Sequence, residues 1–147
     1  MSRRSTSTVA GAFLWEVATA FDGAARELGL VGPAAEDRIL MSATYTDGAL
    51  DYEVLLDLWD LTVETQVRLR EPGIVLVADI EPLVLAAGLV DRRGGISFSA
   101  ASLYALRRSL RGHAAYVRKV QPVLAAGDAA ALLRAAGARE YHPDPEN

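Results

Sequence analysis

Residues 49–70, ALDYEVLLDLWDLTVETQVRLR, are the stretch on which the predicted fold depends. Apolar side chains recur there at every fourth residue, at Leu55, Trp59, Val63 and Val67. Such a spacing is typical of one face of an amphipathic helix. The acids of the same stretch lie on the opposite face of that helix, at Glu53, Asp57, Asp60 and Glu64. We therefore predict one long helix over 49–70, with Trp59 in the core and a solvated acidic face.

The flanking segments extend this pattern. Residues 10–28 have an apolar stripe of helical spacing, and a second helix is predicted over 33–45 with Pro33 in its first turn. Further helices are predicted to begin near residue 79, after Ser97 or Ser99, and after Asp128. A short apolar run at 74–77 fits either a buried strand or a buried helix. The predicted fold class is therefore mainly all-α, a compact bundle of about five to six helices with a possible short strand near 74–77.

The length and composition indicate one globular domain. The chain has 147 residues, of which 51% are hydrophobic and 23% charged, and its richness in Ala, Arg and Gly is bacterial-like. We predict a disordered N-terminus over 1–6, a single helical domain over 7–138 and a flexible tail over 139–147. Because the chain has no cysteine, disulfides, thiolate metal sites and cysteine nucleophiles are excluded.

Targeting signals are not evident in the sequence. Arg3 and Arg4 precede an apolar stretch, but Glu16 and Asp22 interrupt it before it reaches the length of a signal-peptide core. Asp79, Glu81 and Pro82 interrupt the longest apolar segment, which is therefore too polar for a membrane span. We predict a cytoplasmic protein without a membrane partner.

The net charge of −4 conceals a strong division along the chain. Residues 5–90 carry fourteen acids against four arginines, whereas 91–135 carry seven arginines and one lysine against two aspartates. The second half has a predicted basic face of Arg107, Arg108, Arg111, Arg118 and Lys119. These cations either form ion pairs with acids of this chain or of a second copy, or they bind nucleic acid. The layout of Glu81–Arg111 resembles a helix-turn-helix, although the pI of about 5.1 is low for a DNA-binding domain.

Polar and aromatic residues gather around a predicted break at Thr46-Asp47-Gly48. Asp-Gly favours a turn. Tyr45 and Tyr52 flank the break, and tyrosine and tryptophan are common at binding surfaces. His113 lies where the apolar and basic sides of its helix meet, as a half-buried structural histidine or a general base. The candidate ligand or partner surface consists of Trp15, Tyr45, Asp47, Asp51, Tyr52 and His113.

No catalytic motif is evident in the chain. It contains no Gly-x-Ser-x-Gly, no phosphate-binding loop and no Glu-x-x-His pair, so we predict neither a metal nor a cofactor. The leading hypothesis is a small soluble helical binding or accessory protein, acting as a homo-oligomer or as a subunit bound to another protein. One alternative is a small DNA-binding transcriptional regulator that uses 79–119. The other is a small metabolic enzyme with a cleft between Tyr45 and Asp57, so enzymatic activity stays an open question.

Overall fold

A computed structural model describes residues 3–37 and 40–143, and within them the chain forms four helices and one six-stranded antiparallel sheet. The elements in chain order are α1 (Arg3–Leu28), β1 (Val31–Asp37), β2 (Met41–Thr46), β3 (Leu50–Asp57), β4 (Thr62–Glu71), β5 (Ile74–Asp79), α2 (Ile80–Ala86), α3 (Leu103–Ala126), α4 (Ala129–Ala135) and β6 (Arg139–Tyr141).

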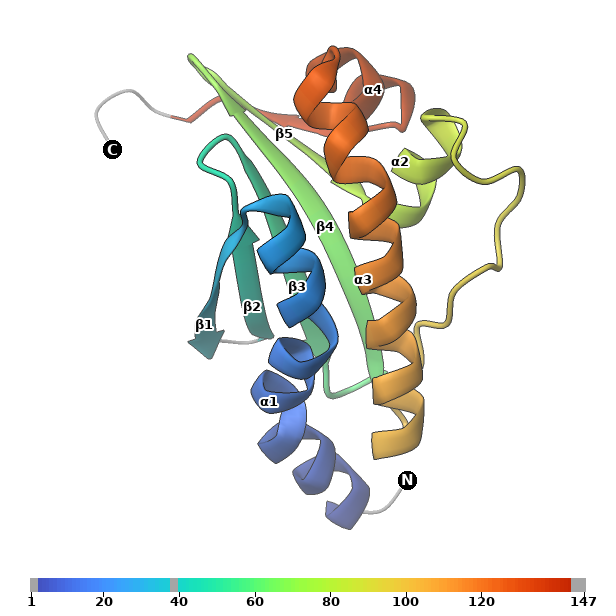
Figure 1. Cartoon of the computed structure of the whole chain (residues 1–147). Helices are drawn as coiled ribbons and strands as arrows, with labels where there is room; N and C mark the ends of the chain where they lie inside the picture. The colour runs from blue at the N-terminus through green and yellow to red at the C-terminus, as the bar shows by residue number, and fades with distance from the viewer. Residues whose placement is uncertain (1–2, 38–39, 144–147) are drawn as a thin grey trace.

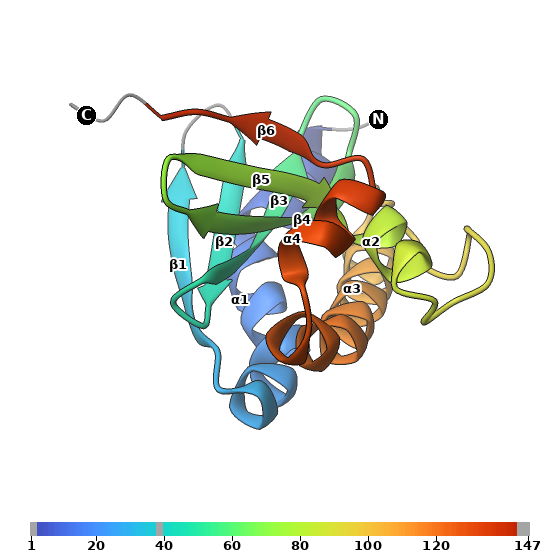
Figure 2. The same ribbon diagram turned by 90° about the horizontal axis from the view of Figure 1, so that it is seen from above.

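The fold has two layers. The strands follow one another across the sheet in chain order, from β1 to β6. Helices α1 and α3 lie side by side on one face of the sheet, while α2 and α4 lie beside them near β5 (Figures 1 and 2). The two long helices are parallel, because Glu16 pairs with Arg107 and Glu27 pairs with Arg118, eleven residues further along each helix. We call the opposite side of the sheet the open face.

The prediction of an all-α helical bundle is wrong. Residues 49–70 form the β3–β4 hairpin, in which Leu50 pairs with Leu69 and Leu56 pairs with Val63. The buried residues alternate along both strands, at Leu50, Tyr52, Val54 and Leu56 and at Val63, Thr65, Val67 and Leu69. Because four is a multiple of two, a spacing of four residues fits a strand as well as a helix. The spacing of Val63 and Val67 was therefore consistent with both structures. Leu55 of the same predicted stripe alternates with the buried Leu56 and lies on the other side of β3, so its predicted place in the core is wrong.

The predicted helix over 33–45 is also wrong, since residues 33–37 belong to β1 and residues 41–45 to β2, while 38 and 39 lie outside the described residues. The strand considered for 74–77 is present as the first part of β5. Strand β6 was not predicted. Residues 1–2 and 144–147 of the predicted flexible termini lie outside the described residues, so their flexibility stays a prediction.

Helices α1 and α3 agree better with the sequence analysis. Val17, Phe21 and Ala25 are buried on α1, although Leu14 of the expected stripe is exposed. On α3 the predicted core residues Leu106, Leu110, Ala114 and Val117 are all buried. Within the described part of the chain, no helix has the length and apolar character needed to cross a membrane.

The segment between α2 and α3 covers an edge of β4. Strand β5 pairs with β4 only from Gln66 onward, which leaves the first residues of β4 without a neighbour on that side. The backbone nitrogen of Val63 donates to the oxygen of Phe98, and that of Ala100 donates to the oxygen of Leu61, both at 2.8 Å. These hydrogen bonds satisfy backbone groups that would otherwise form an unpaired strand edge.

The position of Trp59 is a second correction. Trp59 lies in the turn between β3 and β4 and is 94% exposed, so its predicted place in the core is wrong. We expect Trp59→Ala to change the free energy of unfolding by less than about 0.5 kcal/mol, because the ring contributes little to packing. Urea denaturation followed by circular dichroism measures this change, and a loss above about 2 kcal/mol would contradict the exposed position.

Candidate functional site

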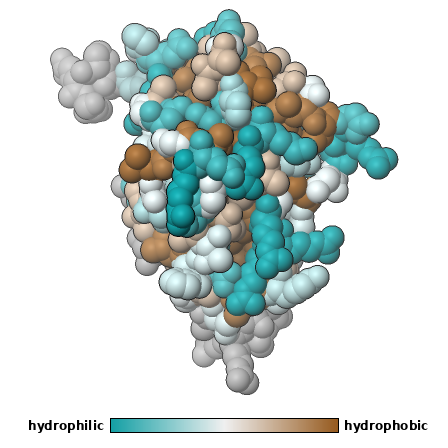
Figure 3. Space-filling model, in the orientation of Figure 1, coloured by the Kyte–Doolittle hydropathy of each residue, from teal (hydrophilic) through white to brown (hydrophobic). Residues whose placement is uncertain are grey.

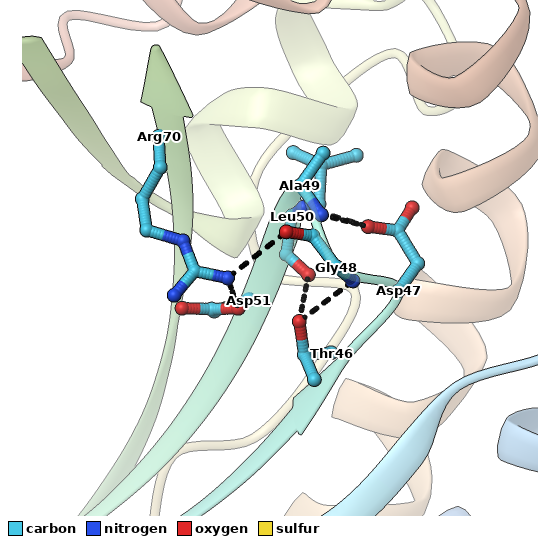
Figure 4. Close-up of polar contacts among 7 residues, drawn as sticks. All are labelled: Thr46, Asp47, Gly48, Ala49, Leu50, Asp51 and Arg70. Carbon is cyan, nitrogen blue, oxygen red and sulfur yellow. Dashed lines mark hydrogen bonds and ion pairs between the residues drawn. The ribbon is translucent and has the colours of Figure 1, made fainter. Parts of the chain in front are cut away.

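The predicted break at Thr46-Asp47-Gly48 is the hairpin turn between β2 and β3 (Figure 4). The Oδ1 atom of Asp47 accepts hydrogen bonds from the backbone nitrogens of Ala49 at 2.9 Å and Leu50 at 2.7 Å. Gly48 has a φ of +102°, a conformation that disfavours side chains. The chain therefore turns at the predicted position, but it connects two strands rather than two helices.

The two tyrosines beside this turn face the helices. Tyr52 is fully buried, and its hydroxyl donates a hydrogen bond to Oε1 of Gln121 on α3. Nε2 of Gln121 in turn donates to Oδ2 of Asp47 at 2.8 Å. Burial raises the pKa of Tyr45 to about 12. Burial and the nearby Asp47 carboxylate also raise the pKa of Tyr52 well above its ordinary value. The tyrosines thus hold α1 and α3 against the sheet rather than lining an accessible cleft.

Hydrogen bonding explains the acidity of Asp47. Burial acts to raise its pKa, but hydrogen bonds from the backbone of Leu50, the amide of Gln121 and the backbone of Ala49 outweigh burial and lower the pKa. Asp47 therefore stays ionised as a structural acceptor of the turn.

Asp51 lies on the opposite side of the sheet from Tyr52. Nη2 of Arg70 donates to Oδ1 of Asp51 and to the backbone oxygen of Gly48, each at 3.1 Å (Figure 4). The β2–β3 turn and strand β3 therefore position the Arg70 guanidinium over the open face, where no described helix covers the sheet.

The open face contains a shallow depression of about 310 Å³, which we call the sheet hollow. Side chains that alternate along β4, β5 and β6 line it, namely Gln66, Arg68, Arg70, Val75, Val77 and Tyr141. Strand register places them in rows: Arg70, Val75 and Tyr141 are neighbours across three strands, and Arg68 is a neighbour of Val77. Val77 is only 4% exposed and contributes an apolar floor, whereas Tyr141 is half-exposed at the rim.

Three arginines around the hollow retain unused donors. Nη2 of Arg68 lies 3.6 Å from Oε1 of Glu53, and Nη2 of Arg139 lies 4.0 Å from Oδ1 of Asp79. Arg70 also uses only its Nη2 atom. A guanidinium has five N–H donors on three nitrogens. The Nε and Nη1 donors of these arginines therefore have no partner among residues 8–36 and 40–143, whose side chains the structure describes, and can bind an anion.

The other end of the open face is acidic. Burial, with the charges of Asp79 and Glu81, raises the pKa of Glu64 to about 7, while the hydrogen bond from the backbone nitrogen of Thr65 opposes the rise. Glu81 is buried and accepts a hydrogen bond from the backbone nitrogen of Gly94 at 3.1 Å. Among the described residues, no group of three or more His, Asp and Glu side chains is arranged to bind a metal ion. One end of the open face thus has Glu64 and Asp79, and the other has Arg68 and Arg70 with their partner acids Glu53 and Asp51.

The raised pKa of Glu64 predicts a pH-dependent effect on stability. Between pH 4.5 and about 7 the folded chain retains a proton that the unfolded chain has released, so folding stability falls as the pH rises. We expect Glu64→Gln to raise the free energy of unfolding by about 1–2 kcal/mol at pH 8, allowing for partial solvent screening, and to have little effect at pH 4.

Chemical denaturation at the two pH values measures this difference. Glu53→Gln is the matched control, because it neutralises a carboxylate of the same face that pairs with Arg68. The control should give no gain in stability at pH 8. An equal gain for Glu64→Gln at both pH values would contradict the explanation.

The predicted basic face lies on the helix side of the molecule, where hydrophilic side chains run over the middle of the surface (Figure 3). Nε of Arg107 lies 3.0 Å from Oε1 of Glu16, and Nε of Arg118 lies 2.9 Å from Oε2 of Glu27. These two arginines connect α3 to α1. Arg108, Arg111 and Lys119 form no ion pair or hydrogen bond with the described part of the chain.

The remaining predicted residues, Trp15 and His113, lie in different surroundings. Trp15 is 75% exposed on α1, beside Ala18 and Asp22. His113 is fully buried between Oγ1 of Thr65 at 2.8 Å and the backbone oxygen of Ser97 at 3.0 Å. Burial lowers the pKa of His113 to about 4 despite its hydrogen bond to Ser97. A neutral imidazole with both nitrogens bonded has a structural role.

The structure therefore does not bring the six predicted surface residues into one site. Asp51 contributes by positioning Arg70, whereas sequence reasoning missed Arg68, Arg70 and Tyr141. The available signal was the alternation of Val67 and Leu69 with the two arginines, since successive residues of a strand face opposite sides. Comparison with known proteins gives no further assignment, because no family model, curated protein or solved structure significantly matches this chain.

Proposed function

We propose that this protein is a non-catalytic binding module of the cytoplasm and that the open face of its sheet is the binding surface. The single observation that carries the proposal is the sheet hollow, in which Arg68 and Arg70 flank an apolar floor of Val75 and Val77. Arginine and tyrosine are the residues most often enriched at the centres of protein interfaces. A half-exposed Tyr141 at the rim is consistent with that composition.

The bound partner in this proposal is a second copy of the chain or another protein. Antiparallel sheets with one covered face commonly have polar residues on the other, and β4 has Thr62, Glu64, Gln66, Arg68 and Arg70 on this face. The partly exposed Val75 beside the guanidinium groups of Arg68 and Arg70 combines an apolar contact with directional donors. Such a combination supports specific binding more than a uniformly charged surface does.

The two alternatives from the sequence remain predictions with less support. The DNA-binding hypothesis relies on the basic face, in which Arg107 and Arg118 are paired with acids of α1. The enzyme hypothesis relies on a cleft near Tyr45 and Tyr52, and both rings are buried.

Photocrosslinking in cells tests the proposed surface. Benzoylphenylalanine at Tyr141 replaces an aromatic ring at the rim of the hollow, and the same residue at Tyr104 of α3 is the matched control on the helix side. We expect a discrete adduct at position 141, identified by mass spectrometry as a second copy or a specific protein. An adduct at 104 but not at 141 would place binding on the helix side and contradict the proposal.

A further inference from the structure

The two arginines of the sheet hollow have the spacing of an extended chain. Arg68 and Arg70 are two residues apart on β4 and face the same side of the sheet. Alternate residues of a strand are separated by roughly 6.6–6.8 Å. An extended polypeptide that lies along β4 has the same repeat, so its side chains at positions i and i+2 can reach the two guanidinium groups together.

The guanidinium donors that face such a chain favour an anionic partner. Arg68 has only a loose ion pair with Glu53 at 3.6 Å, and Arg70 uses a single nitrogen for Asp51 and Gly48. Their Nε and Nη1 atoms have no described protein partner. A carboxylate forms charge-assisted hydrogen bonds with a guanidinium group that are roughly twice as strong as neutral ones, so the side chains at i and i+2 should be acidic.

The apolar floor of the hollow favours glutamate over aspartate as the ligand side chain. Val77 lies next to Arg68 and Val75 lies next to Arg70 in the register of β4 and β5. An acidic side chain that approaches either arginine from above β5 passes over a valine. Glutamate has two methylene groups to cover the partly exposed Val75, whereas aspartate has one, and covering apolar surface favours binding. Val77 is only 4% exposed and adds little to this contact.

The charge polarity of the open face gives the ligand a preferred position. Glu64 and Asp79 lie at one end, and Arg68 and Arg70 lie at the other. Near pH 7 Glu64 is about half protonated and Asp79 has Arg139 within 4.0 Å, so the first end repels an acidic ligand only weakly. The donors of Arg68 and Arg70 that their partner acids leave unused favour the second end. Tyr141 closes the row of Arg70 and Val75 and offers its ring to the ligand backbone.

We propose that the sheet hollow binds an extended acidic segment of a partner polypeptide, in which two glutamates separated by one residue engage Arg68 and Arg70 over the valine floor. This inference rests on the proposed function of the open face and specifies the chemistry of the partner. The residue between the glutamates faces solvent and can vary, because successive side chains of an extended chain point in opposite directions.

An NMR titration of the full ¹⁵N-labelled chain at low salt tests the inference. The probe is the synthetic peptide Gly-Ser-Glu-Ser-Glu-Ser-Gly. We expect saturable shifts of the backbone amides of β4, β5 and β6 around the hollow, with binding that weakens as salt is added. Arg68→Gln with Arg70→Gln should weaken binding by roughly tenfold or more, since each arginine supplies charge-assisted hydrogen bonds.

Two matched controls separate this geometry from general charge attraction. Arg108→Gln with Arg111→Gln makes the same change in net charge on the helix side, and it should leave the dissociation constant unchanged. An isomeric peptide with adjacent glutamates, Gly-Ser-Glu-Glu-Ser-Ser-Gly, should bind more weakly. Equal binding of both peptides, or equal loss in both double variants, would overturn the inference.

The crosslinking experiment makes the two proposals distinguishable. A specific adduct at position 141 without saturable peptide shifts would overturn the acidic-segment inference and leave the binding module supported. Absence of both results would count against the open face itself. Circular dichroism of the Arg68→Gln, Arg70→Gln variant verifies that the chain is folded before its binding is interpreted.

Discussion

Replacing His113 with alanine is expected to lower the free energy of unfolding by about 3–5 kcal/mol, the range for loss of a large buried side chain. The imidazole is fully buried and contacts the ring of Phe98 edge-on, with centroids 5.1 Å apart. Its loss also leaves the hydroxyl of Thr65 and the backbone oxygen of Ser97 without their partner. Because Ser97 belongs to the segment that covers the edge of β4, the variant should also expose this edge. Urea denaturation and amide hydrogen exchange of β4 measure both effects.

His113 also makes the free energy of unfolding depend on pH. The pKa of His113 is about 4 in the folded chain and 6.5 as its ordinary value. Between these values the unfolded chain binds the additional proton, so the stability falls as the pH is lowered from 6.5 towards 4. The contribution of His113 to this loss is about 3 kcal/mol between pH 7 and pH 4.

His113→Gln provides the comparison, because glutamine retains a donor and an acceptor but does not titrate. The difference in the free energy of unfolding between the unsubstituted chain and the His113→Gln variant should shrink or reverse in acid. A difference that is constant with pH would show that His113 does not titrate in this interval. Because carboxylates elsewhere are common to both chains, their contributions cancel in the comparison.

Phe21→Ala is the second substitution with a large expected effect, a loss of about 3–5 kcal/mol. Phe21 is 1% exposed on α1, and its ring is stacked on that of Tyr45 of β2, with centroids 5.4 Å apart. Removal of the ring opens a cavity between helix and sheet and forfeits the aromatic contact. Chemical denaturation measures the change.

Trp15→Ala is the matched control on the same helix. Trp15 is as large an aromatic residue, but its ring is exposed, so its loss should cost less than about 0.5 kcal/mol. Similar losses for the two variants would contradict the orientation of α1 on the sheet.

The spacing of apolar residues predicted correctly those elements whose pattern fits only one kind of secondary structure. The stripe of Leu106, Leu110 and Val117 on α3 has spacings of four and seven, and arginines between its members fit only the opposite side of a helix. The turn at Asp47-Gly48 was predicted because it depends on short-range chemistry, namely an aspartate that binds the backbone two and three residues ahead and a glycine with a positive φ.

The β3–β4 hairpin could not be predicted from the same spacing. Val63 and Val67 are four residues apart and face the core of a strand as well as they would face the core of a helix. The β-branched residues Thr62, Val63, Thr65 and Val67 favour a strand, but such preferences are weaker than packing. The choice depended on neighbouring strands, which satisfy the backbone of 50–57 and 62–71 together.

The sequence by itself determined the absence of cysteine, two amphipathic helices with their apolar stripes, and a turn at residue 47. Only the tertiary structure decided which residues share a surface. Alternation along β3 places the adjacent Asp51 and Tyr52 on opposite faces of the sheet, so their proximity in sequence does not make a site. Strand register brings Tyr141 into one row with Arg70, although they are far apart in the chain. The physical reason is that side-chain direction in a sheet follows from pairing with distant strands, whereas in a helix it follows from spacing alone.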